Sequence, residues 1–119
     1  MHEASLVRPL LREIERLCAE HAGERLIGVT LSLGYLSGVD ADYLRHAFLE
    51  HAPGTLAQGA TLTIDSGDPE VACDRCHWQG AAALPELSCG VCGSPQTRLI
   101  SGTDLLLKSL TFEAVMTTA

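Results

Sequence analysis

Apolar residues recur every three or four positions over residues 4–21, a pattern that predicts an amphipathic helix. The apolar positions are Leu6, Val7, Leu10, Leu11, Ile14, Leu17 and Cys18. Ser5 is the expected N-cap, because its hydroxyl can accept a hydrogen bond from a free N–H of the first turn. Pro9 is expected in that first turn, since it has no N–H to donate, and Gly23 is expected to end the helix.

The next two elements are a strand and a second helix. Apolar and small or polar residues alternate over residues 26–34, which predicts a strand with one apolar face. A helix is predicted over residues 42–51, with Asp40 as its N-cap. A short strand over residues 61–65 follows.

The end of the chain contains one more predicted strand, over residues 105–115. Leucines occupy both of its period-two faces at the start, so we expect its first half to be buried on both sides. Turn-forming residues at 66–69 and 101–104 separate the intervening segment from the rest of the chain.

That intervening segment carries Cys73-Asp74-Arg75-Cys76 and, twelve residues later, Cys89-Gly90-Val91-Cys92. Each Cys-x-x-Cys turn can direct two sulfurs to one ion, so the spacing predicts a tetrahedral four-thiolate site for zinc. Four thiolates close the coordination sphere, which favours a structural metal over a catalytic one. A thioredoxin-type redox pair is the weaker alternative, because it needs one pair in a βαβ setting rather than two matched knuckles. Iron in the same cage remains open.

These patterns together predict an α+β fold. A small mixed sheet packed with two helices forms an α/β lobe from residues 1–67 and 103–119. A zinc-ribbon-like lobe, residues 68–102, is inserted into it. Residue 77 is a histidine beside the first knuckle, and we interpret it either as a surface residue or as a group that tunes the metal site.

Composition and charge narrow the function. The chain has 119 residues and a net charge of −7, so it lacks the clustered basic residues that a nucleic-acid-binding protein needs. No stretch is long and apolar enough for a membrane span, and no secretory signal is recognisable. The cysteine count is odd, at five, which fits a reducing compartment, so we expect a cytoplasmic protein.

The first three residues, Met1-His2-Glu3, form a second set of metal ligands. The Met1 amine, the deprotonated backbone nitrogen of His2 and its imidazole can bind one ion in fused rings, and such nitrogen sets suit Ni(II) or Cu(II). Glu3 could supply a fourth ligand. Taken alone, His2 is more typical of an ordinary surface residue than of a metal ligand.

Four features follow one another along the chain: Met1-His2-Glu3, the predicted helix and strand after it, the segment Leu36-Ser37-Gly38-Val39-Asp40, and the Cys-x₂-Cys-x₁₂-Cys-x₂-Cys motif. Together they resemble the HypA/HybF family of hydrogenase nickel-incorporation proteins. The resemblance covers essentially the whole chain. It implies a nickel metallochaperone of [NiFe]-hydrogenase maturation, not an enzyme, that binds nickel transiently.

Site residues also follow from the resemblance. It makes His2 the key nickel ligand beside the Met1 amine, with Glu3 in a direct or supporting role. Asp40 lies where some members have an acidic residue, so it is a further nickel-binding candidate beside its role as a helix N-cap. The four cysteines of the motif correspond to structural zinc ligands.

The resemblance further implies two partners, a HypB-type GTPase and the hydrogenase large subunit. A monomer and a homodimer both remain open. The main alternative is a zinc-ribbon module for docking to protein or nucleic acid, which predicts a basic face. A thiol-dependent enzyme is the other, and it predicts cysteines that react without metal removal.

Overall fold

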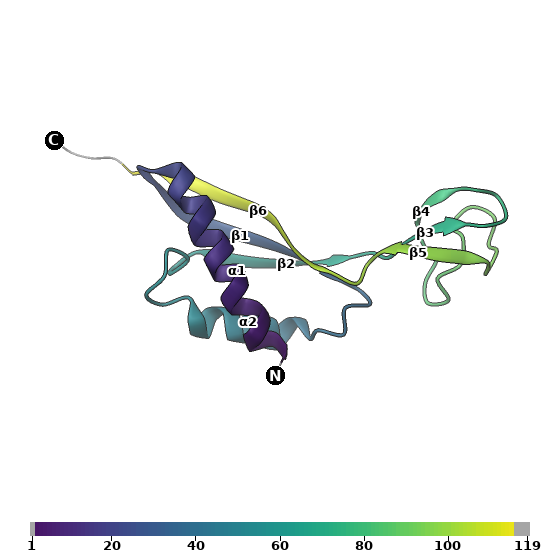
Figure 1. The fold of residues 1–119 in the computed structure, drawn as a ribbon, viewed down its shortest axis with the longest axis horizontal. Helices are drawn as coiled ribbons and strands as arrows, with labels where there is room; N and C mark the ends of the chain where they lie inside the picture. Colours follow the sequence, from purple (N-terminus) through teal and green to yellow (C-terminus); the bar gives the residue numbers. More distant parts are fainter. Residues whose placement is uncertain (1, 116–119) are drawn as a thin grey trace. The chain divides into compact units, whose positions relative to one another are not determined.

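The computed structural model describes residues 2–115, and it describes side chains from Ser5 onward. In the described residues, two helices and six strands follow one another along the chain, and both helices precede the last five strands (Figure 1). The elements are α1 (His2–Cys18, continued by a 3₁₀ turn at Ala19–His21), β1 (Glu24–Gly34), α2 (Ala41–His51), β2 (Thr61–Gly67), β3 (Glu70–Cys73), β4 (Gln79–Ala81), β5 (Thr97–Ser101) and β6 (Leu105–Ala114). The expected α+β fold, with small sheets, two helices and a cysteine lobe, is confirmed.

The chain divides into two compact units. The first comprises Met1–Leu31, Val39–Ile64 and Leu107–Ala119, and the second comprises Ser32–Gly38 and Asp65–Leu106. Both helices therefore belong to the first unit, and the cysteines of both knuckles belong to the second.

One three-stranded sheet has the order β2-β1-β6. The Gly34 N–H donates to the Asp104 carbonyl and the Val115 N–H to the Gly23 carbonyl, so β1 and β6 run antiparallel. Strand β2 runs the same way as β1, because Thr61 lies beside Gly28 at one end and the Gly67 carbonyl accepts from the Tyr35 N–H at the other. The sheet is therefore mixed, with α2 as the connection between its two parallel strands.

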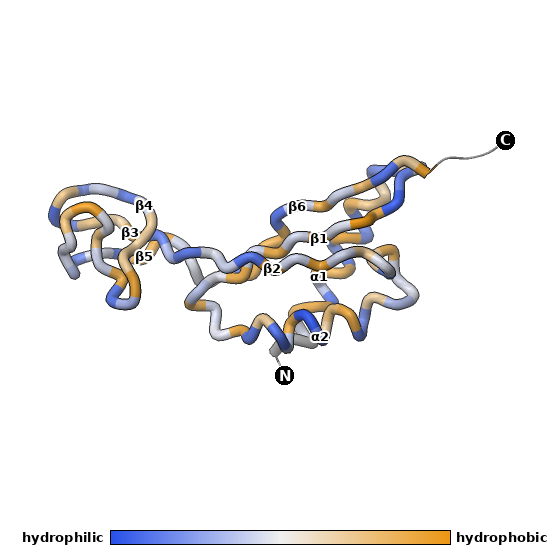
Figure 2. Tube along the Cα trace, turned by 180° about the vertical axis from the view of Figure 1, so that it is seen from behind, coloured by the Kyte–Doolittle hydropathy of each residue, from blue (hydrophilic) through white to orange (hydrophobic). Residues whose placement is uncertain are grey.

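The core of the first unit is aliphatic apart from Phe48, as a chain with 4% aromatic residues requires. In Figure 1, α1 crosses the strands of the mixed sheet. Buried side chains come from both helices and from β1: Val7, Leu11, Ile14, Leu44, Ala47, Phe48, Leu26, Val29 and Leu31. The period-3.6 stripe of α1 and the alternation of β1 thus both contribute side chains to this core. Figure 2 shows the hydropathy of each residue along these elements.

The start of α1 differs from the prediction. The helix begins at His2, so Ser5 is inside it and is not its N-cap, and Pro9 lies in the helix interior rather than in the first turn. A proline there removes one backbone hydrogen bond and costs about 3 kcal/mol. Burial of Val7 and Leu11 on either side of Pro9 offsets this cost, because each fully buried aliphatic side chain contributes roughly 1.5–3 kcal/mol.

Strand β6 also differs from the prediction, because none of its side chains is buried and Leu106 is 57% exposed. The strand lies at an edge of a three-stranded sheet and has only one neighbour. Its half-buried residues are Leu105, Leu107, Leu110 and Phe112, so they lie on one face of the strand at its start and on the other face further along. No face of the strand is therefore continuously covered.

The second sheet has the order β4-β3-β5 and is antiparallel throughout. Strand β2 extends through Gly67, so the turn predicted at 66–69 is reduced to Asp68 and Pro69. Val71 in the central strand is buried and pairs with Gly80 on one side and Leu99 on the other. Among the described residues, no helix is long and apolar enough to cross a membrane.

Candidate metal centre

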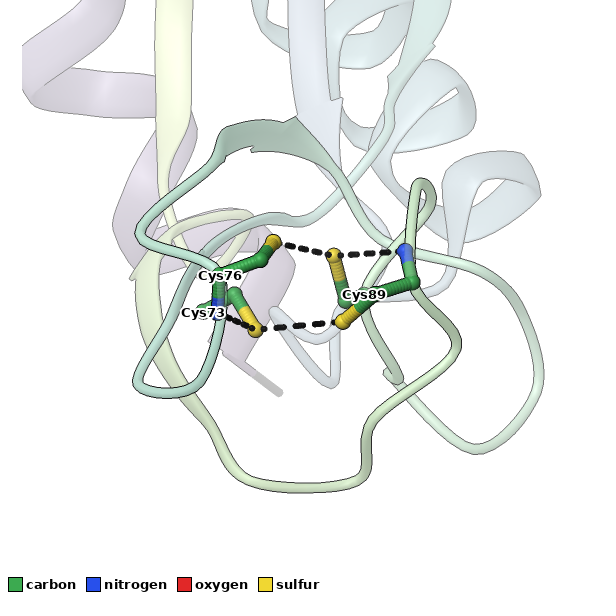
Figure 3. Close-up of side chains that lie close together, drawn as sticks. Cys73, Cys76 and Cys89 are labelled. Atoms are coloured by element: carbon green, nitrogen blue, oxygen red, sulfur yellow. Dashed lines mark hydrogen bonds between the residues drawn. The ribbon is translucent and has the colours of Figure 1, made fainter.

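The second sheet places the first cysteine knuckle at the end of its central strand. Cys73 is the last residue of β3, and Cys76 lies in the turn that follows. Cys89 and Cys92 lie in a second turn before β5. The four Sγ atoms lie within 4.8 Å of one another and form a metal-binding cluster. Figure 3 shows the sulfurs of the two knuckles facing each other. The Sγ atoms of Cys73 and Cys92 are 3.6 Å apart, and so are those of Cys76 and Cys89.

The two knuckles have the same backbone hydrogen bonds around their first sulfur. The N–H groups of Arg75 and Cys76 both donate to Cys73 Sγ over 3.3 Å. Those of Val91 and Cys92 donate to Cys89 Sγ over 3.4 Å. These donors stabilise negative charge on sulfur, so each turn favours a thiolate before any metal binds.

The equivalence extends one residue beyond each knuckle. The His77 N–H donates to the Cys73 carbonyl over 3.1 Å, and the Gly93 N–H donates to the Cys89 carbonyl over 3.0 Å. His77 has φ of 65° and Gly93 has φ of 76°, so both are left-handed. Only glycine adopts this conformation without strain, and the histidine therefore occupies a position that the turn makes costly.

The surroundings of Cys73, Cys76 and Cys89 shift the pKa values of these thiols in different directions. The Cys92 N–H lowers the pKa of Cys89 to about 6, and the Cys76 N–H lowers the pKa of Cys73. The Trp78 N–H acts in the same direction on Cys76, but burial and the neighbouring sulfurs raise its pKa to about 12. Four sulfurs this close cannot all carry charge without a cation, so the cluster is suited to holding one.

Trp78 supports the cluster by filling the space beside two glycines. A Cβ at Gly80 would lie 2.7 Å from Cη2 of the Trp78 ring, and one at Gly90 would lie 3.1 Å from the same atom. Gly90 is thus required for close packing and not for a left-handed turn, whereas Gly93 has the positive φ expected of a knuckle glycine. Sequence inspection identified the cysteines but missed this contact, for which the only signal was the glycine within the second motif.

Asp40 caps α2, as predicted. Its Oδ1 accepts from the Asp42 N–H over 2.9 Å and from the Tyr43 N–H over 3.2 Å. Its proposed role in nickel binding stays a prediction. Met1 lies outside the described residues, as do the side chains of His2 and Glu3.

Cys18 does not join the cluster. It lies half-buried near the end of α1, where burial raises the pKa of its thiol. In the part of the chain whose side chains are described, the knuckle cysteines are the only group of three or more metal-ligating residues whose ligand atoms converge.

Comparison with known proteins matches nearly the full length of the chain. A family model described as hydrogenase/urease nickel incorporation, metallochaperone, HypA matches residues 1–112. A protein named hydrogenase maturation factor HypA from Nitrosospira multiformis is 34% identical over 110 residues, which are 92% of this chain and 96% of the relative. One of the same name from Syntrophus aciditrophicus is 40% identical over 106 residues, 89% and 93% of the two chains.

The fold is also found in a solved structure. The solution structure of the nickel metallochaperone HypA from Helicobacter pylori superposes with a TM-score of 0.71, at 23% identity, over 95% of this chain and 98% of that one. With the family match over residues 1–112, the conclusion is that this chain belongs to the HypA family of hydrogenase and urease nickel-incorporation metallochaperones.

Proposed function

We propose that the protein binds Ni(II) at its N-terminus and delivers it during maturation of a [NiFe]-hydrogenase. The observation that carries the proposal is the family match, which begins at Met1 and so includes Met1-His2-Glu3. Nickel is the cargo, and the protein performs binding and hand-over without catalytic turnover.

The start of α1 suits such a site. Because α1 begins at His2, the first N–H groups of the helix have no intrahelical acceptor. The His2 backbone nitrogen can therefore lose its proton to a metal without breaking a helical hydrogen bond. The Met1 amine and the His2 imidazole complete a nitrogen-rich set that suits Ni(II).

The same location favours release. The positive end of the helix dipole disfavours a cation by roughly 0.3–1 kcal/mol, and the acidic Glu3 in the first turn offsets this effect. Nickel bound at a chain terminus by few side-chain ligands is then held weakly enough to be exchanged. Any contribution from Asp40 would come from Oδ2, because Oδ1 is engaged in capping α2.

The cysteine cluster fits zinc, which we propose as its resident metal. A Zn–S bond of about 2.3 Å places the sulfurs of a regular tetrahedron about 3.8 Å apart. The observed Cys73–Cys92 and Cys76–Cys89 separations of 3.6 Å are close to that value. Bound zinc would offset half of the negative charge of the four thiolates and hold the second unit together, and it would not be delivered.

The partners that the proposal requires are a HypB-type GTPase and the hydrogenase large subunit. Hand-over between such proteins would take place in the cytoplasm. Family membership supports these roles, and the acidic surface is compatible with a basic face on either partner.

Nickel titration of tag-free protein tests the proposal against three variants. His2→Ala and a short extension before Met1 each remove part of the chelate. Each should weaken nickel binding at least about tenfold, because even the loss of a group that only orients a metal ligand costs roughly 10–100-fold. His46→Ala removes an exposed histidine of α2 and should bind nickel as the parent does. Parent-like affinity in both N-terminal variants would place the nickel site elsewhere.

A further inference from the structure

A depression of about 220 Å³ lies in the first unit, between α1 and the end of α2. It has no part in the proposed nickel or zinc sites. Its lining residues are Arg8, Leu11, Arg12, Glu15, His51 and Thr55. The first four are spaced i, i+3, i+4 and i+7 on α1, so they share one face of that helix.

The floor and walls of the depression differ in character. Leu11 is 5% exposed and forms an apolar floor. Arg8 and Arg12 stand one helical turn apart, and neighbours at this spacing have Cβ atoms about 5–6 Å apart. His51, the last residue of α2, supplies a third nitrogen-bearing side chain from the opposite helix.

Neither arginine has a carboxylate partner among the described residues, although the chain is acidic. The protein has 15 acidic and only 8 basic residues. Arg16 pairs with Glu13, Arg25 with Glu113, and Arg98 with Asp74. Within the described part of the chain, Arg8 and Arg12 form no ion pair, although both line the same depression.

We propose that this depression is an oxyanion-binding site that takes one carboxylate or phosphate group of a ligand. The guanidinium fork matches the geometry of both groups, and an arginine–oxyanion pair is stronger where neighbouring apolar surface excludes water. The volume equals roughly seven times the ~30 Å³ share of one water molecule, which is enough for such a group and part of its hydration shell.

Two neighbouring groups limit the affinity. Glu15 lines the same depression and repels an anion. The Thr55 hydroxyl already donates to the Ala52 carbonyl over 2.7 Å, so recognition rests on the basic side chains. The site should therefore be selective for oxyanions over chloride and moderate in strength.

Titration followed by amide and arginine side-chain NMR signals tests the proposal on the full-length, zinc-loaded protein. Inorganic phosphate, a blocked glutamate-containing peptide and sodium chloride are added separately at constant ionic strength. We expect saturable shifts at Arg8, Arg12 and His51 with phosphate or with the peptide, and none with chloride. The tighter of the two oxyanions identifies the source of the ligand group.

The variant Arg8→Gln/Arg12→Gln should weaken this binding at least about tenfold, because it removes two charge-assisted contacts. Arg16→Gln/Arg25→Gln is the matched control, since it removes the same charge from two exposed arginines of the first unit that do not line the depression. Its binding should equal that of the parent. Shifts that do not saturate, or that persist in the double variant, would overturn the proposal.

Glu15→Gln supplies an independent test of opposite sign. Removing the repelling carboxylate should tighten oxyanion binding about two- to threefold. Glu20→Gln changes a carboxylate of the neighbouring turn that does not line the depression, so it should leave the affinity unchanged. Equal affinities in the Glu15 and Glu20 variants would contradict the assignment of the site.

Discussion

Single residues decide how the two cysteine knuckles are made. The turns have the same hydrogen bonds, yet one ends in His77 and the other in Gly93. Both residues have positive φ, and nothing lies within 4 Å of the position a Cβ at Gly93 would take. The difference between the knuckles is therefore one of backbone strain and not of crowding.

Exchanging the two residue types should change stability in opposite directions. His77→Gly relieves roughly 1–2 kcal/mol of strain against the ~0.5–1 kcal/mol entropic cost of a glycine, so we expect a gain of up to about 1 kcal/mol. Gly93→Ala should cost about 1 kcal/mol. Urea denaturation of the zinc-loaded protein measures both.

The same variants separate the two interpretations of His77. If it is only a surface residue, His77→Gly should keep its metal as tightly as the parent. A weaker metal affinity in this variant, measured by competition with a chelator, would instead assign His77 a role in the metal site.

At the scale of elements, α2 depends on its cap. Asp40 Oδ1 accepts from two N–H groups that the helix itself cannot satisfy. It is also a predicted nickel-binding residue, and one substitution that keeps the cap can separate the two roles.

Asp40→Ala should lower the free energy of unfolding by about 1 kcal/mol, because it removes the cap. Asp40→Asn keeps an acceptor oxygen and should stay within a few tenths of a kcal/mol of the parent. Denaturation curves measure the stability. Nickel titration of the asparagine variant then reports the role of the charge alone, and unchanged nickel affinity would leave Asp40 with capping as its only role.

The two helices and the strands of the first sheet could be predicted from the sequence, whereas the short strands of the second sheet could not. The stripe of α1 and the alternation of β1 each extend over several turns or residue pairs, and both match the structure. Strand β4 has only the three residues Gln79–Ala81 and carries no period. The burial of β6 was mispredicted because leucine content does not reveal that a strand lies at a sheet edge.

On the scale of the whole molecule, some site residues could be predicted from the sequence and others could not. The cysteines were recognisable because their spacing is local and specific. The depression beside Arg8 and Arg12 was not, because it also needs His51, which is distant in sequence and is brought to α1 only by the packing of α2.

We further propose that the two predicted lobes, residues 1–67 with 103–119 and residues 68–102, differ in their need for metal. Removing zinc leaves clustered thiolates with no compensating charge, so the second lobe should lose most of its folding free energy. The first has an aliphatic core of its own and should remain folded.

Amide hydrogen exchange before and after chelation measures this difference. Protection should be lost at Val71 and its neighbours in β3 and kept at Leu44 and Phe48 in α2. Returning zinc should restore the original pattern. Loss of protection in α2 on chelation would show that the lobes do not fold independently.

The packing of Trp78 against Gly80 and Gly90 has an optical consequence. Trp78 is the only tryptophan of the chain and belongs to the second unit, whereas both described helices belong to the first. Tryptophan emission therefore reports the metal-binding unit, and ellipticity at helical wavelengths reports the other. One sample without any label thus gives two separate unfolding curves, and their coincidence or separation measures how strongly the units are coupled.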